Sequence, residues 1–297
     1  MIDFERMPPK LPPPTVICSL VCHRHVDMAT ICLGSIARLC EEPVSFRIHD
    51  DGTLTEEDCD RLSIIGNVDF VHRRQADELM GSVLKKMPNC LALREELPLA
   101  LKLLDTILLA PSDEYAFVDS DVLFLKRFAN PFRCGLYPSR VAFMRDREHS
   151  YCLRSWNAAS STCPRLPAKV NTGIVVFDRS QFDLEFVEWF LRQPFSKAIP
   201  PMREQTAWAF LGKKRDCQVF DESQIRVMRE NESDGGLVAG HFTAKTRHLL
   251  PQYRVLSEDA DLEAQPIRIQ TKPCGTCTSL DLAWYEVRRT WQKFFRR

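Results

Sequence analysis

The chain has 297 residues, and its 40 Lys and Arg residues balance its 40 Asp and Glu residues. This length accommodates one large α/β domain or two small ones, and the charge balance excludes the global basic field of a nucleic-acid-binding domain. No run of about 18 apolar residues occurs, so no segment is expected to span a membrane.

The N-terminus and the cysteines indicate the compartment. Residues 1–14 are rich in proline and lack the apolar core of a signal peptide, which predicts an extended leader. With no secretion signal, we expect the 12 cysteines to be reduced and the protein to be cytoplasmic. Only Cys274 and Cys277 form a patterned pair, compatible with a redox couple or half a zinc site. No second pair and no nearby His-x-x-x-His motif completes a zinc site, which favours a structural role.

Strands and helices alternate in the first quarter of the chain. Apolar runs predict strands over residues 15–21, 44–48 and 68–72. Helical periodicity covers residues 26–39, and Thr55 is a good N-cap for a helix that runs to about residue 62. This order predicts a parallel sheet with right-handed crossovers.

The remaining elements continue the same pattern without a clear linker or an internal repeat. We therefore expect a single α/β domain with a central, mostly parallel sheet flanked by helices. A long loop is expected over residues 145–167, because this stretch is poorly periodic. The other predicted elements are helices over 97–109, 182–191 and 204–211, and strands over 141–144, 170–177 and 238–242.

The most informative stretch is residues 115–125, where two carboxylates lie between two apolar runs. A run of this kind predicts a strand buried on both faces, and ligands bind at the carboxyl ends of such strands. Asp119 and Asp121 would point to the same side, because strand side chains alternate. Two buried carboxylates need a cation, and oxygen ligands suit Mg²⁺ or Mn²⁺.

The Asp-x-Asp pattern alone is weakly specific, so its context decides its meaning. Two further triplets, at residues 58–60 and 259–261, lie in acidic, polar surroundings and are predicted to be solvated. Only the triplet at 119–121 follows an apolar strand. A pair of turn or capping aspartates at the strand end is the alternative interpretation.

Four groups of residues follow one another along the chain: Asp51-Gly52, Asp119-x-Asp121, Asn171-Thr172-Gly173, and His241 followed by Lys245 and Arg247. With this ordered set, the chain resembles the nucleotide-sugar-dependent glycosyltransferases of the GT-A fold. It is most similar to the branch of glycogenin-like and bacterial lipopolysaccharide sugar transferases. The resemblance spans roughly residues 15–250 and predicts a leader (1–14), a GT-A domain (15–255) and a C-terminal extension (256–297).

The resemblance implies a divalent metal, Mn²⁺ or Mg²⁺, bound by Asp119, Asp121 and His241. It also implies a nucleotide-sugar donor, expected to be a UDP-sugar, with Asp119 able to reach its ribose. Glu204 and Gln205 resemble an Asp-Gln pair of the family, with Glu in place of Asp, and are the candidate catalytic residues. The residues expected to contact the donor are Asp51 (base or ribose), Lys245 and Arg247 (diphosphate), Asn171, Thr172 and Gly173 (sugar), and Lys102, which resembles a helical lysine near the donor.

Four of these residues also have structural interpretations that the sequence leaves open. His241 is alternatively a hydrogen-bonded core histidine, and Asp51 part of an ordinary Asp-Gly turn. Lys102 could snorkel from a core helix. Glu204 could be a first-turn carboxylate that interacts with the helix dipole.

The C-terminus carries a separate signal, a basic and aromatic amphipathic helix. Such a helix suits peripheral contact with the anionic inner face of a membrane. The alternative is a helix that docks its aromatic side chains on the domain. The apolar face comprises Trp284, Val287, Trp291, Phe294 and Phe295, and the basic residues are Arg288, Arg289, Lys293, Arg296 and Arg297.

The leading hypothesis is a metal-dependent glycosyltransferase that moves a sugar from a nucleotide diphosphate to an unknown glycan, lipid-linked or protein acceptor. One alternative is a phosphohydrolase of the haloacid dehalogenase type, whose nucleophile motif resembles residues 119–122. That motif normally closes the first strand, whereas three predicted strands precede it here. The second alternative is a non-catalytic binding protein with the GT-A fold.

Overall fold

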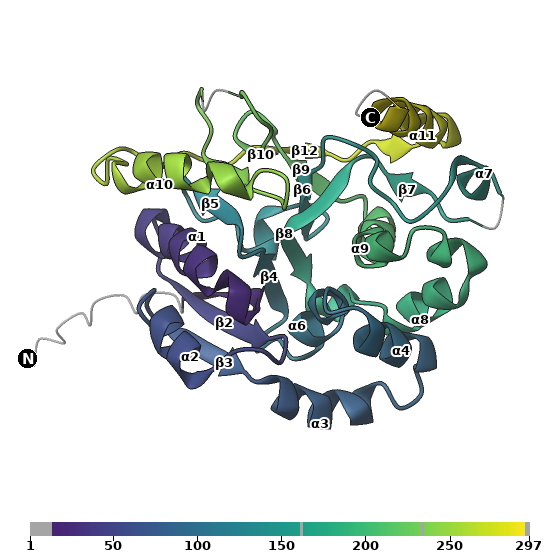
Figure 1. Cartoon of the computed structure of the whole chain (residues 1–297), viewed down its shortest axis with the longest axis horizontal. Helices are drawn as coiled ribbons and strands as arrows, with labels where there is room; N and C mark the ends of the chain where they lie inside the picture. Colours follow the sequence, from purple (N-terminus) through teal and green to yellow (C-terminus); the bar gives the residue numbers. More distant parts are fainter. Residues whose placement is uncertain (1–13, 161–162, 233–234, 295–297) are drawn as a thin grey trace, which may run out of the picture.

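The centre of the molecule is an eight-stranded sheet, shown in Figure 1 with helices on both sides. The computed structural model describes residues 14–160, 163–232 and 235–294. Four of the seven neighbouring pairs of strands are parallel (β1–β2, β1–β4, β2–β3 and β6–β9), which confirms the predicted α/β class. In spatial order the strands are β12 (Thr271–Pro273), β9 (Gln218–Phe220), β6 (Val141–Arg145), β8 (Val170–Asp178), β4 (Glu114–Val118), β1 (Thr15–Val21), β2 (Val44–Asp50) and β3 (Val68–Val71).

The first three strands form the parallel half of the sheet, as the sequence predicts. Helix α1 (Val26–Leu39) connects β1 to β2, and α2 (Glu56–Ser63) connects β2 to β3. Thr55 caps α2 in a capping box, because its side chain accepts from the Asp58 N–H and the Asp58 carboxylate accepts from the Thr55 N–H. Asp58 is therefore a buried structural carboxylate, and the prediction of a solvated triplet at residues 58–60 is wrong for this residue.

Two hydrophobic cores cover the two faces of the sheet. On β4, Tyr115 and Phe117 pack into one core and Ala116 and Val118 into the other. The helices α8 (Leu184–Arg192) and α9 (Arg203–Lys213) contribute to the first core, and α1 contributes to the second. β4 is buried on both faces, which explains its continuous apolar sequence.

The stretch 115–125 is not one strand, and here the structure corrects the prediction. β4 ends at Val118, and β5 (Val122–Phe124) belongs to a separate three-stranded sheet. β5 pairs with β11 (Ala239–His241), which pairs in turn with β10 (Ile225–Val227). Residues 119–121 form the corner between the two sheets, and the pairing places His241 opposite Val122.

Other elements differ from the predictions in extent. The helix predicted over 97–109 is two short helices, α5 (Ala100–Leu103) and α6 (Asp105–Leu108), which are separated at Leu104. Helices α3 (Arg73–Val83) and α4 (Pro88–Glu96) precede them and were not predicted. The loop expected over 145–167 contains the short helix α7 (Ser155–Ala158). The described part of this loop is otherwise mostly irregular, as predicted.

The C-terminal segment returns to the body of the molecule. After α10 (Leu250–Glu258), β12 pairs with β9 at the edge of the central sheet, and β13 (Thr276–Cys277) pairs with β7 (Leu166–Pro167). The last element is α11 (Ser279–Phe294). The predicted boundary at residue 255 lies within α10, and the division of the chain into a domain and an extension stays a prediction.

Two sequence predictions concern the ends of the chain. The leader and residues 295–297 lie outside the described residues, apart from Pro14. In the described part of the chain, every helix is too short or too polar to cross a membrane. On α11, Trp284 and Val287 are 71% and 52% exposed, so these two side chains are not docked on the domain.

Candidate functional site

Asp119, Asp121 and His241 meet at the corner between the two sheets. His241 Nε2 lies 3.0 Å from Asp121 Oδ1 and 3.6 Å from Asp119 Oδ2. One ligand atom of each of the three residues lies within 4.8 Å of the other two, so the group could hold a metal ion. Asp121 and His241 are buried, whereas the Asp119 side chain is 26% exposed, so the cluster opens toward solvent at Asp119.

β8 supports this corner from the neighbouring position in the sheet. The Asp119 N–H donates to the Gly173 carbonyl oxygen at 2.8 Å, which continues the β4–β8 ladder to the start of the corner. A Cβ atom on Gly173 would lie 2.5 Å from His241 Nδ1 and 2.9 Å from Asn171 Oδ1. Glycine is therefore required here because the backbone of β8 packs directly against the imidazole.

Asn171 determines the tautomer of His241. Asn171 Oδ1 accepts a hydrogen bond from the Gly173 N–H at 2.8 Å and lies 3.1 Å from His241 Nδ1. A backbone N–H can only donate, so the shared atom is the amide oxygen, and Nδ1 must donate its proton to it. In the neutral imidazole, Nε2 then carries the free lone pair and faces both carboxylates.

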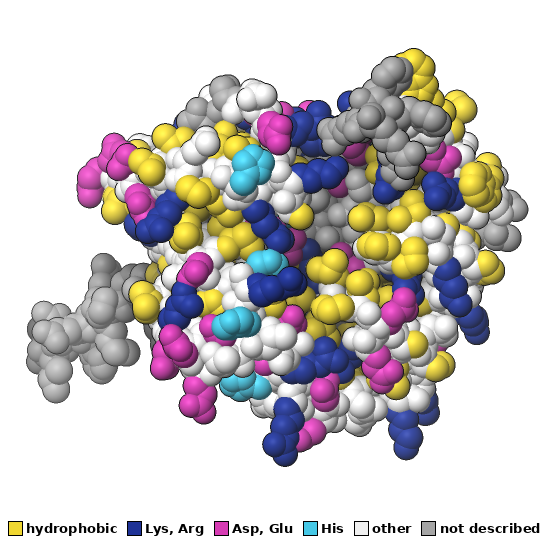
Figure 2. Space-filling view, viewed as in Figure 1, with side chains coloured by type: hydrophobic (Ala, Val, Ile, Leu, Met, Phe, Trp, Pro, Cys, Tyr) yellow, Lys and Arg dark blue, Asp and Glu magenta, His cyan; other side chains and the backbone are white. Residues whose placement is uncertain are grey.

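Arg247 contacts the cluster at Asp121. Its Nη2 and Nε donate to Asp121 Oδ2 at 2.7 and 3.0 Å, and its Nη1 lies 3.0 Å from His25 Nε2. Burial by itself raises the pKa of Asp121, but His241 and Arg247 outweigh it and hold that pKa below its usual range. Burial lowers the pKa of His241, and the Asp121 carboxylate reverses this effect and raises it. Figure 2 shows Lys, Arg and His side chains gathered near the middle of this face.

Lys102, on α5, contacts the cluster at Asp119. Its Nζ donates to both oxygens of Asp119, at 2.8 and 2.9 Å, and lies 4.7 Å from the centre of the Phe117 ring. The Lys102 side chain is only 3% exposed. The ammonium group therefore does not snorkel to solvent, and the ion pair orients one of the two aspartates of the corner.

Glu204 is a buried carboxyl group beside this ion pair. Glu204 lies in the first turn of α9. Thr172, on β8, donates from its Oγ1 to Glu204 Oε2 at 3.3 Å. Glu204 Oε1 is buried without a hydrogen-bond partner in the described part of the chain. Burial raises the pKa of Glu204 to about 7, although Lys102 opposes this rise. Such a group changes its charge near neutral pH, unlike an exposed helix-capping carboxylate.

Gln205 leads to a residue that the sequence analysis did not identify. Its Nε2 donates to the Ser150 carbonyl oxygen at 2.8 Å and lies 3.4 Å from Asp146 Oδ2. Asp146 is buried, and burial raises its pKa, while hydrogen bonds that include one from Asn171 lower it. Asp146 lies two residues after the strand predicted over 141–144, which is the signal that could have pointed to it.

Two predicted donor-binding residues lie outside the hydrogen-bonded cluster. Asp51 follows β2, and its Oδ1 accepts from the N–H and the hydroxyl of Thr53 at 3.1 and 2.6 Å, as in a local turn. Lys245 is exposed in the segment after β11 and makes no hydrogen bond or ion pair with the described residues. His25, which contacts Arg247, was not predicted, because no pattern in the sequence connects these two residues.

No family model matches the sequence, and no curated protein is similar to it in sequence. Solved structures are nevertheless similar to it in three dimensions. Mouse xyloside xylosyltransferase 1 in its apo form has a TM-score of 0.55 at 11% identity, covering 78% of this chain and 98% of that chain. The galactosyltransferase LgtC, solved with donor and acceptor sugar analogues, has a TM-score of 0.50 at 10% identity, covering 85% and 98%.

An active-site Gln-to-Glu mutant of LgtC gives a TM-score of 0.51 at 10% identity with the same coverage. Because the sequence identities to these structures are only 10% and 11%, the similarity shows the fold alone. The predicted GT-A fold is confirmed: this chain has the fold of these sugar transferases.

Proposed function

We propose that this protein transfers a sugar from a nucleotide diphosphate donor, expected to be a UDP-sugar, with the help of a divalent metal. The observation that carries the proposal is the convergence of Asp119, Asp121 and His241 at the corner between β4 and β5. The GT-A fold supports the same reaction class by analogy. The acceptor would be a glycan, a lipid-linked sugar or a protein.

The donor atoms of this cluster fit Mn²⁺ or Mg²⁺. Two carboxylates and one imidazole provide two negative charges and a neutral nitrogen, a combination suited to Mn²⁺ in particular. Asn171 fixes the imidazole with Nε2 toward the carboxylates, which is the support that a metal-binding histidine normally has. When bound, the ion supplies Lewis-acid stabilisation of the diphosphate leaving group.

The two cations of the site have different roles in this proposal. Arg247 sits on the partly exposed side of the cluster and would turn part of its guanidinium to the diphosphate, whose charge grows as the sugar leaves. Lys245, exposed in the same segment, would approach the diphosphate from solvent. Lys102 would keep its contact with Asp119 and position that carboxylate, because its ammonium group is buried.

Glu204 and Gln205 would lie on the sugar side of the site. The unpartnered Oε1 of Glu204 is available to accept a hydrogen bond from a sugar hydroxyl, and the ionised form could take a proton from the acceptor. Thr172 orients the other oxygen. Gln205 is held by Ser150 and Asp146, and we propose that it contributes its amide oxygen to the acceptor side. We propose Asp51 as the contact to the base or ribose.

A phosphohydrolase of the haloacid dehalogenase type is not favoured. In the structure, Asp119 follows β4, which is preceded along the chain by the three parallel strands β1, β2 and β3. The nucleophile motif of that class normally closes the first strand. A non-catalytic binding protein is also less well supported, because the cluster of Asp119, Asp121 and His241 could hold a metal ion and the buried Glu204 lies beside it.

The test is turnover of UDP-sugars by the purified chain with Mn²⁺. Wild-type protein should hydrolyse or transfer the sugar slowly, and Asp121→Ala or a chelator should abolish this activity while the fold persists. Asp261→Ala, in one of the other Asp-x-Asp triplets, is the matched control and should retain activity. Full activity of Asp121→Ala, or hydrolysis of p-nitrophenyl phosphate in place of UDP-sugars, would overturn the proposal.

We further propose that α11 contacts an anionic membrane surface. Trp284, Val287 and Trp291 are exposed, and Figure 2 shows apolar side chains in this upper right region of the molecule. Arg289 is also exposed on α11, whereas Arg288 lies 3.2 Å from Glu148. Basic side chains near such a surface each contribute roughly 1 kcal/mol.

Vesicle sedimentation tests this contact. Replacing the exposed Trp284 and Val287 by Ser should abolish sedimentation with vesicles that contain phosphatidylserine and leave donor hydrolysis in solution unchanged. Vesicles of phosphatidylcholine alone are the control and should sediment less of the wild-type chain. Equal sedimentation of this double variant and the wild type would contradict the membrane contact.

A further inference from the structure

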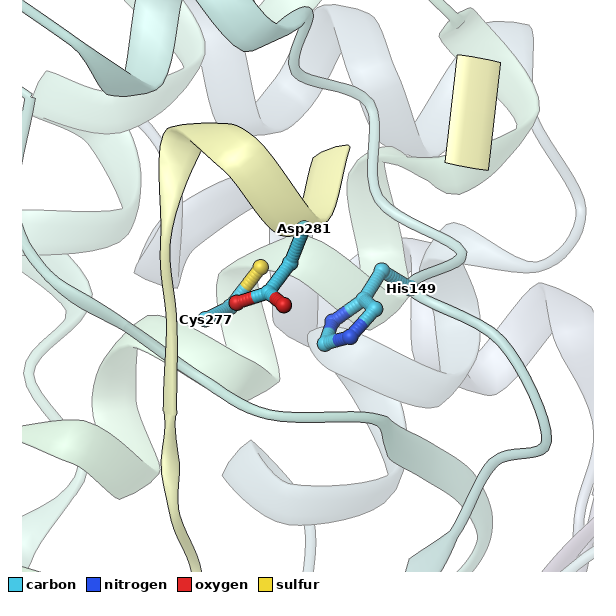
Figure 3. A group of neighbouring side chains, drawn as sticks. All are labelled: His149, Cys277 and Asp281. Atoms are coloured by element: carbon cyan, nitrogen blue, oxygen red, sulfur yellow. The ribbon is translucent and has the colours of Figure 1, made fainter. Parts of the chain in front are cut away.

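A second cluster of metal-binding side chains lies away from the Asp-x-Asp corner. Figure 3 shows His149, Cys277 and Asp281, with the imidazole of His149 and the sulfur of Cys277 both near the Asp281 carboxylate. One ligand atom of each residue lies within 4.8 Å of the other two. His149 comes from the segment after β6, whereas Cys277 ends β13 and Asp281 lies in the first turn of α11. Segments more than 100 residues apart thus supply one site.

The potential ligand atoms in this cluster lack ordinary partners. His149 Nδ1 is buried and has no hydrogen-bond partner in the described part of the chain. Asp281 Oδ2 accepts from the N–H and hydroxyl of Thr278 at 2.8 and 2.7 Å and so caps α11. The other oxygen, Oδ1, makes no hydrogen bond to a described residue. The Cys277 thiol has only a long contact of 3.7 Å with the Thr278 carbonyl oxygen.

We infer that His149, Cys277 and Asp281 bind a Zn²⁺ ion. A thiolate, an imidazole nitrogen and a carboxylate oxygen form a ligand set that zinc accepts in tetrahedral sites. The proposed metal site at Asp119, Asp121 and His241 has no sulfur ligand, whereas this second cluster includes the Cys277 thiol. The fourth position falls to water, because no further His, Cys, Asp or Glu side chain joins the cluster in the described residues.

Binding at this site exchanges a proton for the metal. Cys277 is buried, and a metal binds the deprotonated form of its thiol. Zn²⁺ would take the place of this proton, which leaves to solvent, and no electron is transferred. The thiolate and the carboxylate together balance the charge of the ion, and Lys169, whose positive charge acts on His149 and Asp281, remains beside it.

The position of the cluster indicates what the ion would do. His149 is adjacent to Ser150, whose carbonyl oxygen accepts from Gln205, and it lies three residues after Asp146. Cys277 and Asp281 anchor the start of α11. Zinc would therefore fasten the C-terminal helix to the segment that holds Gln205, next to the proposed acceptor side.

Cys277 belongs to the Cys-x-x-Cys pair of the sequence, but its partner takes no part in the site. Cys274 Sγ instead lies 3.2 Å from the Ala168 carbonyl oxygen, and the Cys274 N–H donates to the Cys217 carbonyl oxygen at 2.9 Å. The completing ligand is a distant histidine. This explains why the spacing of the cysteines alone did not predict a zinc site.

Cobalt substitution tests this inference in the full-length protein. Co²⁺ bound to a thiolate gives a near-ultraviolet charge-transfer band, which the sulfur-free site at Asp119 cannot produce. We expect the band when Co²⁺ is added to metal-depleted wild-type protein, and its loss when Zn²⁺ is added. Cys277→Ser and His149→Gln should abolish it. Cys274→Ser and Asp121→Asn should both retain it, which separates this site from the nucleotide-sugar site.

Thermal unfolding provides a second readout. Zn²⁺ should raise the melting temperature of wild-type protein and of Asp121→Asn, but not of Cys277→Ser or His149→Gln. His149 is half-buried, so its replacement by Gln is expected to fold. A folded wild-type protein without the cobalt band would overturn the inference, as would a band that persists in both Cys277→Ser and His149→Gln.

Discussion

The side-chain oxygen of Asn171 fixes which nitrogen of His241 carries a proton. Because Asn171 Oδ1 already accepts from the Gly173 N–H, it can only accept from His241 Nδ1 as well. The free lone pair of the imidazole is thereby turned toward Asp119 and Asp121. A polar residue at the start of β8 thus orients the imidazole of His241, the proposed metal ligand on β11, a strand of a different sheet.

The first prediction concerns this support. Asn171→Ala should weaken Mn²⁺-dependent binding of UDP by about tenfold to a hundredfold, the usual effect of losing the hydrogen-bond partner of a metal-binding histidine. His241→Ala should weaken it at least as much. Titration calorimetry with UDP at fixed Mn²⁺ measures both. Asn67→Ala, an exposed change at the far edge of the sheet, should have no effect. Unchanged affinity in Asn171→Ala would show that the tautomer is fixed by other means.

The second prediction concerns Gly173. Gly173→Ala should destabilise the fold by about 1–3 kcal/mol and reduce Mn²⁺ binding, because the new methyl group would overlap the His241 ring. Gly81, in α3, is the matched control, since a Cβ there would meet no atom within 4 Å. Gly81→Ala should be neutral or slightly stabilising, because alanine favours a helix. Denaturant unfolding compares the two variants, and equal stability of both would contradict the close packing.

The third prediction concerns the buried ion pair of Lys102. Lys102→Met should destabilise the protein by less than the roughly 3–5 kcal/mol typical of a broken, fully buried pair, because the Asp119 side chain keeps 26% of its surface exposed. Mn²⁺ should then raise the melting temperature of this variant more than that of wild type, since the ion would replace the missing positive charge. The exposed Lys197→Met is the control. An equal shift in all three proteins would exclude a metal next to Asp119.

The fourth prediction concerns the pH dependence of turnover. Burial raises the pKa of Glu204 to about 7, so the fraction of Glu204 that is ionised increases as pH rises through neutrality. If this form acts on the substrate, kcat/KM should rise between about pH 6 and about pH 8. Glu204→Gln should lower kcat and flatten this rise. The corresponding change at Glu185, an exposed first-turn carboxylate of α8, should leave the profile unchanged.

Glu204 should also make folding stability depend on pH, in the direction opposite to kcat/KM: stability should fall as pH rises. Its pKa is raised from 4.5 in the unfolded chain to about 7 in the folded state, so the folded protein holds a proton that the unfolded chain loses. Stability therefore falls as pH rises between these two values. Glu204→Gln should remove this part of the decline, as measured by urea unfolding at several pH values. A decline of unchanged size would assign it to other groups.

Much of this architecture follows from local sequence. The strands β1, β2 and β3 and the helix α1 are visible as apolar runs and helical periodicity, because burial on one or two faces dictates those patterns. Thr55 marks the start of α2 because a cap satisfies orphan N–H groups wherever a helix begins. The Asp-x-Asp pair at residues 119–121 stands out because, unlike the other two triplets, it follows an apolar run.

Local patterns in the sequence could not determine which distant residues meet, and the grouping of His241 with Asp119 and Asp121 came only from the resemblance to the GT-A family. The corner at residues 119–121 exists because β5 pairs with β11 rather than continuing β4, and only this pairing brings His241 to the two aspartates. Pairing of strands more than 100 residues apart leaves no periodic trace. Likewise, the contact of Lys102 on α5 with Asp119 depends on tertiary packing. The meeting of His149 with Cys277 required the C-terminal segment to return to the body of the molecule, a contact that tertiary packing alone decides.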